Sequence, residues 1–318
     1  MAKTKDIDYA YPVAKVRAVE SKLLDRLKLT RMADAQNFQE AVKILKENGY
    51  EGDDEEEMLS GELQRTVDFL KGISPSRGAF DLFLVKHDYH NIKVLLKAEF
   101  LGKDYDHLLV ESGRYSAQLM KNIVTNRAFS GFPQVMKNAV EEAVDLFHKT
   151  GDPQLSDLVL DKAVFREMEE MAEQTGSDYV RDIVATMADL ANIRIFVRVR
   201  RMGRGVDFLM KALLDGGKLK PSAYLREGGA SIGEILKSTP YEALLEQGEG
   251  ITELEKAVDN FLIAYIKKAK FVSFGIEPLV AYLIAKENEI KLVRIILTGK
   301  KNGLPPELIK ERLRDSYV

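Results

Sequence analysis

The chain has 318 residues, of which 45% are hydrophobic and 31% are charged, so it can bury a substantial core and is too apolar for general disorder. Its 47 basic and 50 acidic side chains nearly cancel, which excludes a chain-wide positive field of the kind that attracts nucleic acid. Cysteine is absent, which excludes disulfides, thiolate catalysis and cysteine-ligated metal sites. One core of this length would be unusually large, so we expect the chain to be subdivided.

The beginning of the chain carries charges at Lys5, Asp6 and Asp8, where a signal peptide would need an apolar segment. We therefore expect a cytoplasmic protein. The most apolar stretch, residues 271–285, is 15 residues long and includes Glu277. It falls short of the roughly 20 apolar residues that cross a bilayer, so we expect no membrane span.

Most apolar residues recur at intervals of three and four, as in the series Leu63, Val67 and Leu70, whereas strict alternation is rare. This pattern predicts an all-α protein of about fifteen helices. Asp152–Pro153 and Thr239–Pro240 each place a capping side chain before a proline that suits the first helical turn. We expect a helix to begin at both positions.

An acidic segment, EGDDEEE at 51–57, separates two helical patterns. Its carboxylates would favour the positive N-terminal end of the following helix, so we predict a solvated loop that runs into a first turn. A calcium loop is the alternative, but it needs spaced Asp or Asn ligands, a central glycine and a distal glutamate, which this segment lacks.

The chain contains an internal repeat of about 100 residues. DYHNIKVLLKA at 88–98 matches DLANIRIFVRV at 189–199 with an offset of 101 residues, and KENEIKLVRII at 286–296 is a weaker copy at a further offset of 97. Three copies of one helical module would account for the length without one oversized core.

Asp88 with Asn91, and Asp189 with Asn192, stand three residues apart, so each pair lies on one helix face among apolar neighbours. A buried polar pair must be hydrogen-bonded, which predicts a packing lock between the helices of one repeat. A contact with a partner is the alternative. Acid or base chemistry is disfavoured because the third copy has lysine and glutamate at these positions.

His87 and His90 are also three apart, and two imidazoles at that spacing can share a metal. No further ligands are apparent in the sequence around them, so we interpret them as helix-surface or packing histidines. The sequence predicts no metal and no cofactor.

The most basic segment, RIFVRVRRMGRG, places Arg194, Arg198 and Arg201 in one helical stripe and Arg200 and Arg204 in a second. These arginines are our candidates for a partner interface with an acidic protein surface. A solvated or internally paired face is an open alternative. Nucleic acid is disfavoured, since no RNA-binding aromatic pattern or DNA-binding helix pair accompanies them.

Enzyme signatures are missing from the sequence: it has no phosphate-binding GxxxxGK[ST] loop, no GxGxxG, no GxSxG and no kinase motifs. The residues therefore describe a helical scaffold of three repeats in which no catalytic site is visible.

Three segments resemble the C subunit of the V-type ATP synthases of bacteria and archaea, a relative of the d subunit of the eukaryotic V-ATPase. They are DYHNIKVLLKAEFLG at 88–102, DLANIRIFVRVRRMG at 189–203, and the closing stretch at 277–318, which is the most specific. The resemblance extends over essentially the whole chain.

The resemblance implies three similar helical bundles around a pseudo-threefold axis, forming a funnel. We expect repeats at 1–110, 111–212 and 213–318. It also implies a non-catalytic rotor subunit of the central stalk that couples the central shaft to the membrane rotor ring during ATP-linked proton or sodium transport, attached to the membrane only through that complex. A free helical-repeat adaptor, or an enzyme whose site carries no motif, are the alternatives.

Overall fold

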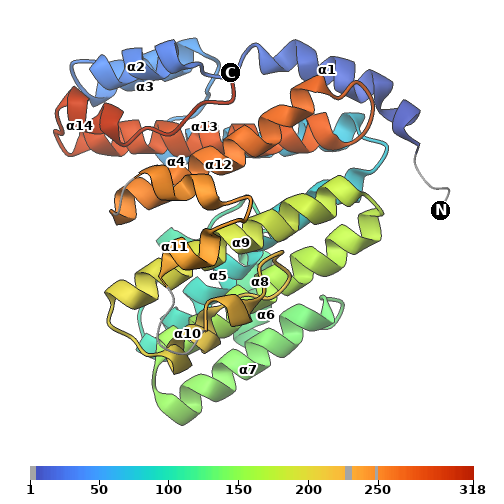
Figure 1. Ribbon diagram of the computed structural model, residues 1–318, viewed down its shortest axis with the longest axis vertical. Coiled ribbons are helices and arrows are strands. Elements are labelled where there is room, and N and C mark those ends of the chain that lie inside the picture. The colour runs from blue at the N-terminus through green and yellow to red at the C-terminus, as the bar shows by residue number, and fades with distance from the viewer. Residues whose placement is uncertain (1–4, 226–230, 248–249) are drawn as a thin grey trace. The chain divides into compact units, whose positions relative to one another are not determined.

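The computed structural model describes residues 5–225, 231–247 and 250–318, and no strand occurs in these ranges. Within them the chain forms fourteen α-helices and six short 3-10 helices (Figure 1). The all-α prediction is confirmed. No helix of the described ranges is both long and apolar enough to cross a membrane.

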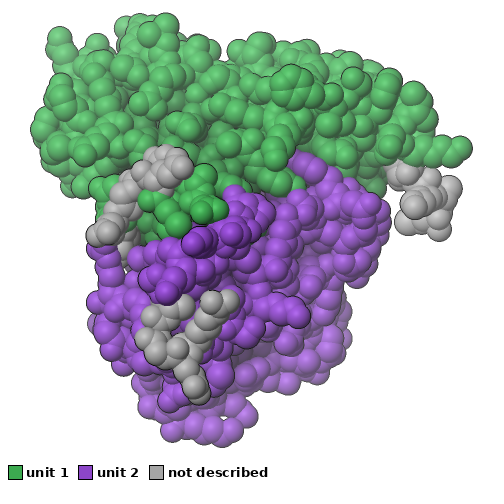
Figure 2. Space-filling model, in the orientation of Figure 1, with its two compact units in different colours: residues 1–77, 241–318 green, residues 78–240 purple. Residues whose placement is uncertain are grey.

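The chain divides into two compact units, one formed by residues 78–240 and the other by residues 1–77 together with 241–318 (Figure 2). The predicted three repeats divide the chain by sequence similarity instead, and they stay a prediction.

The unit formed by 1–77 and 241–318 is built around α13, Glu277–Lys301, which is buried on nearly all sides. Helices from both ends of the chain pack against it, because residues 278–286 form an unbroken buried run and this part of the helix needs cover on every face. The surrounding helices are α1 Ala10–Glu20, α2 Arg26–Asp34, α3 Phe38–Glu47, α4 Glu55–Ile73, α12 Ile251–Lys267 and α14 Pro306–Glu311, with 3-10 segments at Asp6–Tyr9, Glu242–Gln247 and Lys268–Phe271.

In the unit formed by 78–240, α8 packs against α5, α7 and α9, and α6 packs against α5. The amphipathic pattern of α7 shows why these helices pair, since its residues at intervals of three and four are the buried ones: Met136, Ala139, Val140 and Ala143. The helices are α5 Asp81–Leu101, α6 Ala117–Asn126, α7 Gln134–Thr150, α8 Pro153–Thr175, α9 Asp178–Arg201, α10 Val206–Ala212 and α11 Ile232–Leu236, with 3-10 segments at Arg77–Phe80, Asp106–Leu108 and Pro221–Ala223.

One of the two predicted helix starts is confirmed. Helix α7 ends at Gly151 in the left-handed conformation, with φ of 67°, and the Asp152 carboxylate then accepts the Gln154 N–H at 2.8 Å to begin α8. At the second position, Thr239–Pro240, the helix that follows is the 3-10 segment Glu242–Gln247 and not an α-helix. There the Thr239 hydroxyl donates back to the Leu236 carbonyl at 2.6 Å.

The acidic segment at 51–57 is a loop that runs into the first turn of α4, as predicted. The Asp54 carboxylate accepts the Glu57 N–H at 2.8 Å, and three glutamates, 55–57, occupy the first turn. Their negative charge faces the positive end of the helix dipole.

The three similar segments lie in α5, α9 and α13, helices of 21, 24 and 25 residues. Each of these long helices is followed by one short helical element: the 3-10 segment Asp106–Leu108, α10 and α14, respectively. The repeated sequence therefore coincides with a repeated order of elements.

Candidate interaction site and its buried supports

Asp88 and Asn91 of α5 are both fully buried and bond the segment that follows the helix. The Asn91 amide donates to the Val110 carbonyl at 2.8 Å and accepts the Val110 N–H at 2.9 Å. The Asp88 carboxylate accepts the Arg114 N–H at 2.9 Å and also pairs with the Arg114 guanidinium. These bonds fasten the returning segment to one face of the helix.

Asp189 and Asn192 of α9 repeat this arrangement, again without exposure to solvent. The Asn192 amide donates to the Leu214 carbonyl at 2.9 Å and accepts the Leu214 N–H at 2.8 Å. The Asp189 carboxylate accepts the backbone N–H groups of Lys218 and Leu219 at 3.0 and 2.9 Å. In both helices the asparagine holds the second residue after the short helical element.

In each of the two helices, a glycine of the following segment lies against the aspartate carboxylate. A Cβ added to Gly113 would lie 2.4 Å from the Asp88 Oδ1, and one added to Gly217 would lie 2.2 Å from the Asp189 Oδ1. No side chain fits at that distance, so the carboxylate and the backbone can meet only because these residues are glycines. Sequence reasoning identified neither Gly113 nor Gly217 as part of these arrangements.

The ion pair of Asp88 with Arg114 also involves a carboxylate of α8. The guanidinium of Arg114 contacts the Glu167 carboxylate at 2.7 Å, and the Tyr89 hydroxyl donates to Glu167 at 2.8 Å. Burial raises the pKa of Asp88, while Arg114 and the backbone N–H groups act in the opposite direction. Sequence reasoning missed Arg114 and Glu167, since no pattern links charged residues so far apart along the chain.

In the third copy, Lys286 and Glu289 of α13 replace the Asp and the Asn, and both are buried. The Lys286 ammonium contacts Glu289 at 2.6 Å and Glu62 at 2.9 Å. Burial alone would lower the pKa of Lys286, but Glu289 and Glu62 raise it above its ordinary value. These positions therefore hold an ion triad with Glu62 in place of the carboxylate and amide of the other two copies.

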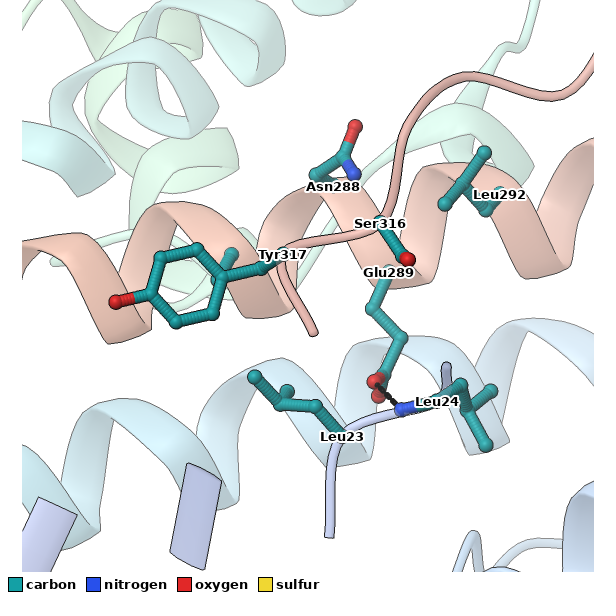
Figure 3. A pocket seen from close by; sticks show the side chains of 8 residues that line it. Leu23, Leu24, Asn288, Glu289, Leu292, Ser316 and Tyr317 are labelled. Atoms are coloured by element: carbon teal, nitrogen blue, oxygen red, sulfur yellow. Dashed lines mark hydrogen bonds between the residues drawn. The ribbon is translucent and has the colours of Figure 1, made fainter. Parts of the chain in front are cut away.

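Glu289 also fastens the N-terminal part of the chain. Its carboxylate accepts the Leu24 N–H, as Figure 3 shows, and the Tyr50 hydroxyl donates to it at 2.7 Å. The hollow beside it does not admit a water molecule, so it is packing space and holds no ligand; it is lined by Leu23, Leu24, Ala285, Asn288, Glu289, Leu292, Ser316 and Tyr317.

The two histidines of α5 face different surroundings. The His90 ring is bonded through Nε2 to the Leu108 carbonyl at 2.9 Å, whereas the His87 Nε2 is buried without a hydrogen bond in the described ranges. Burial, with help from Lys86 and His90, lowers the pKa of His87 to about 3, so its ring is neutral at physiological pH. No group of three or more His, Asp or Glu side chains suited to a metal occurs among the residues that the structure describes.

The candidate interface arginines lie at the C-terminal end of α9 and just beyond it. Arg198, Arg201 and Arg204 are exposed and Arg194 is half-buried. Two of the basic groups lie over aromatic rings of the same unit: the Arg200 guanidinium over Phe196, at 5.3 Å from the ring centroid, and that of Arg204 over Phe208, at 5.4 Å.

Large apolar side chains are exposed beside these arginines, which the sequence did not reveal. Met202, Val206 and Met210 have exposed fractions of 52%, 48% and 55%. They lie at the end of α9 and on α10. A basic segment that also exposes large apolar side chains is typical of a protein interaction site.

A sequence model of the family described as ATP synthase (C/AC39) subunit matches residues 12–312. Curated relatives match over nearly their whole lengths. The C subunit of the V-type sodium ATPase of Enterococcus hirae is 26% identical over 317 residues, covering 95% of this chain and 97% of that protein. The C subunit of the A-type ATP synthase of Methanocaldococcus jannaschii is 26% identical, covering 96% of this chain and 86% of that protein. That of Methanobrevibacter smithii is 27% identical, covering 96% and 88%. Because the family match leaves out only the two ends, this chain belongs to the ATP synthase (C/AC39) subunit family.

Proposed function

We propose that the chain is a non-catalytic rotor subunit of a V-type or A-type ATPase, where it couples the central shaft to the membrane rotor ring. The observation that carries the proposal is the family match over residues 12–312, together with relatives that are each named as the C subunit of such a complex. The match covers 97% of the Enterococcus hirae subunit and 86% of the Methanocaldococcus jannaschii subunit, so the comparison extends over most of each relative.

The three repeats are the geometric part of the proposal. We place copies of one helical unit, at 1–110, 111–212 and 213–318, around a pseudo-threefold axis. The order of elements supports this, because α5, α9 and α13 each precede a short helix. So does the shared bonding of Asn91 to Val110 and of Asn192 to Leu214.

Asp88, Asn91, Asp189 and Asn192 are the locks that keep the first two repeats rigid. A part that transmits torque must resist shear. A buried polar network whose members are all hydrogen-bonded favours a single geometry, because any other geometry would leave buried polar groups unpaired. The locks tie the ends of long helices to the segments that follow them. Their role is structural and not catalytic.

The exposed helix ends are where partners dock. Besides the surface around Met202, apolar side chains are exposed at the same places in the other copies: Leu101 and Leu108 at 49% and 47%, and Leu308 at 47%. Each copy thus presents apolar side chains at the end of its long helix or on the short element that follows. Such a set suits shaft or ring subunits that contact several copies at once, and the subunit is held at the cytoplasmic side of the membrane through them.

A pull-down from detergent-solubilised membranes tests the partner surface. The tagged chain should recover shaft and ring subunits, and Arg198→Glu with Arg201→Glu should reduce that recovery while the free chain keeps its helical content. The reduction should grow at low salt, because exposed charges are screened over about 10 Å at 0.1 M salt. If the double variant recovers shaft and ring subunits as well as the unsubstituted chain does, at low and at high salt alike, this face contacts no partner. If the unsubstituted chain recovers neither shaft nor ring subunits, a free adaptor is favoured.

A further inference from the structure

An aromatic and lysine-rich surface in the unit formed by 1–77 and 241–318 has no part in the locks or in the partner surface above. Phe271 ends the 3-10 segment between α12 and α13, and 91% of its side chain is exposed, the largest exposure of any large apolar residue that the structure describes. Phe274 follows at 49%. Burying a phenylalanine ring is strongly favourable, so a ring held almost entirely in water calls for an apolar partner.

The start of the chain runs beside this segment. The Arg17 guanidinium of α1 donates to the carbonyls of Ala269 and Val272 at 2.6 and 3.2 Å. At the other end of the segment, burial raises the pKa of Glu277, and the negative charge of nearby Asp6 raises it further. Residues 269–277 therefore lie along α1 and the turn before it, in the opposite direction.

This placement brings two more exposed apolar residues to the surface, Ile7 at 61% and Tyr11 at 63%. Four large apolar side chains, none of them packed in the core, thus gather along two neighbouring segments. Figure 1 shows the same neighbourhood, with α1 beside the connection from α12 to α13.

Lysines surround the aromatic residues. Lys267, Lys268 and Lys270 precede Phe271 within one turn, and Lys15 lies on α1 with its ammonium 5.4 Å from the Tyr11 ring centroid. Lys15, Lys267 and Lys268 form no ion pair within the described part of the chain. Their positive charge is therefore available to an external anion.

Few negative charges oppose these lysines. Glu20 is paired with Arg17 at 2.8 Å, and Glu277 is half-buried. Asp6 and Asp8 are exposed at the far end of the surface, where Asp8 accepts the Lys5 N–H. The end around Phe271 is therefore basic.

We propose that this surface, Ile7, Tyr11, Phe271 and Phe274 with Lys15, Lys267 and Lys268, binds the face of a bilayer that contains anionic phospholipids. Aromatic rings that protrude from a turn enter the boundary between headgroups and acyl chains, and lysine stems lie along that boundary with the ammonium groups at the phosphates. A protruding Phe271 between lysines matches this environment in both charge and polarity. The inference does not rest on the proposed rotor function, because it concerns the chain without any ATPase partner.

The chain contains no tryptophan, so Phe271→Trp provides a single fluorescent reporter at the tip of the surface. With vesicles of phosphatidylglycerol and phosphatidylcholine, its emission should shift to shorter wavelength. With phosphatidylcholine vesicles alone it should not. Leu119→Trp, at a position 44% exposed on α6 in the other unit, is the matched control and should keep its emission in both.

Flotation of the full chain with the same vesicles gives the affinities. Phe271→Ser should weaken partition by about tenfold, and Lys267→Gln or Lys268→Gln by about fivefold each, with circular dichroism unchanged. Leu119→Ser should have no effect. No recovery with anionic vesicles, equal recovery with neutral ones, or a wild-type partition for Phe271→Ser would overturn the proposal. Self-association that the same substitution abolishes, without binding to vesicles, would instead identify the surface as a contact between copies.

Discussion

Replacing Asn192 by leucine tests the lock on α9 with little change of volume. Leucine fills the space of the amide but offers neither donor nor acceptor, so the Leu214 N–H and carbonyl lose their partners at 2.8 and 2.9 Å. Leu214 is 2% exposed, so water cannot replace the lost bonds. Each buried group left unpaired costs about 1–3 kcal/mol, and the pair should cost about 2–5 kcal/mol of unfolding free energy.

The equivalent substitution on α5 should cost less. Asn91→Leu also strands two backbone groups, but Val110 is only half-buried, so water can reach them. Asn126→Leu is the control, because the Asn126 amide is exposed and, among the residues that the structure describes, bonds only the Asn122 carbonyl of its own helix. Its effect should stay within about 0.5 kcal/mol.

Urea unfolding followed by far-ultraviolet circular dichroism gives these free energies, and hydrogen exchange of the Leu214 amide reports the broken bond directly. The expected order of destabilisation is Asn192→Leu, then Asn91→Leu, then Asn126→Leu. If Asn192→Leu unfolds at the same urea concentration as Asn126→Leu, the lock contributes no stability and our reasoning on burial fails.

Three further outcomes are expected. Gly217→Ala should destabilise the chain by about 1–3 kcal/mol in urea unfolding, because its Cβ would overlap the carboxylate of Asp189; a neutral result would show that the loop can move away. The lowered pKa of His87 means that the unfolded chain binds a proton that the folded chain refuses, so stability should be full above pH 6.5 and fall toward pH 3 by up to about 1.4 kcal/mol per pH unit. His87→Leu should flatten that slope in melting curves recorded across the range, and an unchanged slope would place the acid sensitivity elsewhere. Lys286→Met should cost about 3–5 kcal/mol in urea unfolding, because the buried carboxylate of Glu289 and the partly buried one of Glu62 lose their counter-charge; Glu62→Gln added to it should restore part of the loss, and no recovery would mean that the triad is not the cause.

The local features of the fold could be predicted from sequence because they depend on near neighbours. The three- and four-residue periods indicated helices, and Asp152–Pro153 marked the start of α8. Asp88 and Asn91 could be assigned to one helix face for the same reason. The type of helix after Thr239–Pro240 could not be predicted in this way: a 3-10 segment follows, and the Thr239 hydroxyl bonds the Leu236 carbonyl behind it.

Contacts between residues far apart in the sequence could not be predicted. Gly113 and Gly217 lie 25 and 28 residues after the aspartates they touch, and only the course of the intervening loop brings them together. The contact of Lys286 with Glu62 joins residues from opposite ends of the sequence. Periodicity shows which face of a helix is buried, but it does not show which other helix covers that face.

Reconstitution of the complete ATPase into sealed vesicles, with and without this chain, tests the coupling role most directly. ATP hydrolysis and ion uptake should be followed in the same sample. Without the chain, we expect phosphate release from the catalytic head to continue while ion uptake disappears, and adding the chain back should restore uptake. Ion pumping that continues at an undiminished rate in its absence would contradict the account.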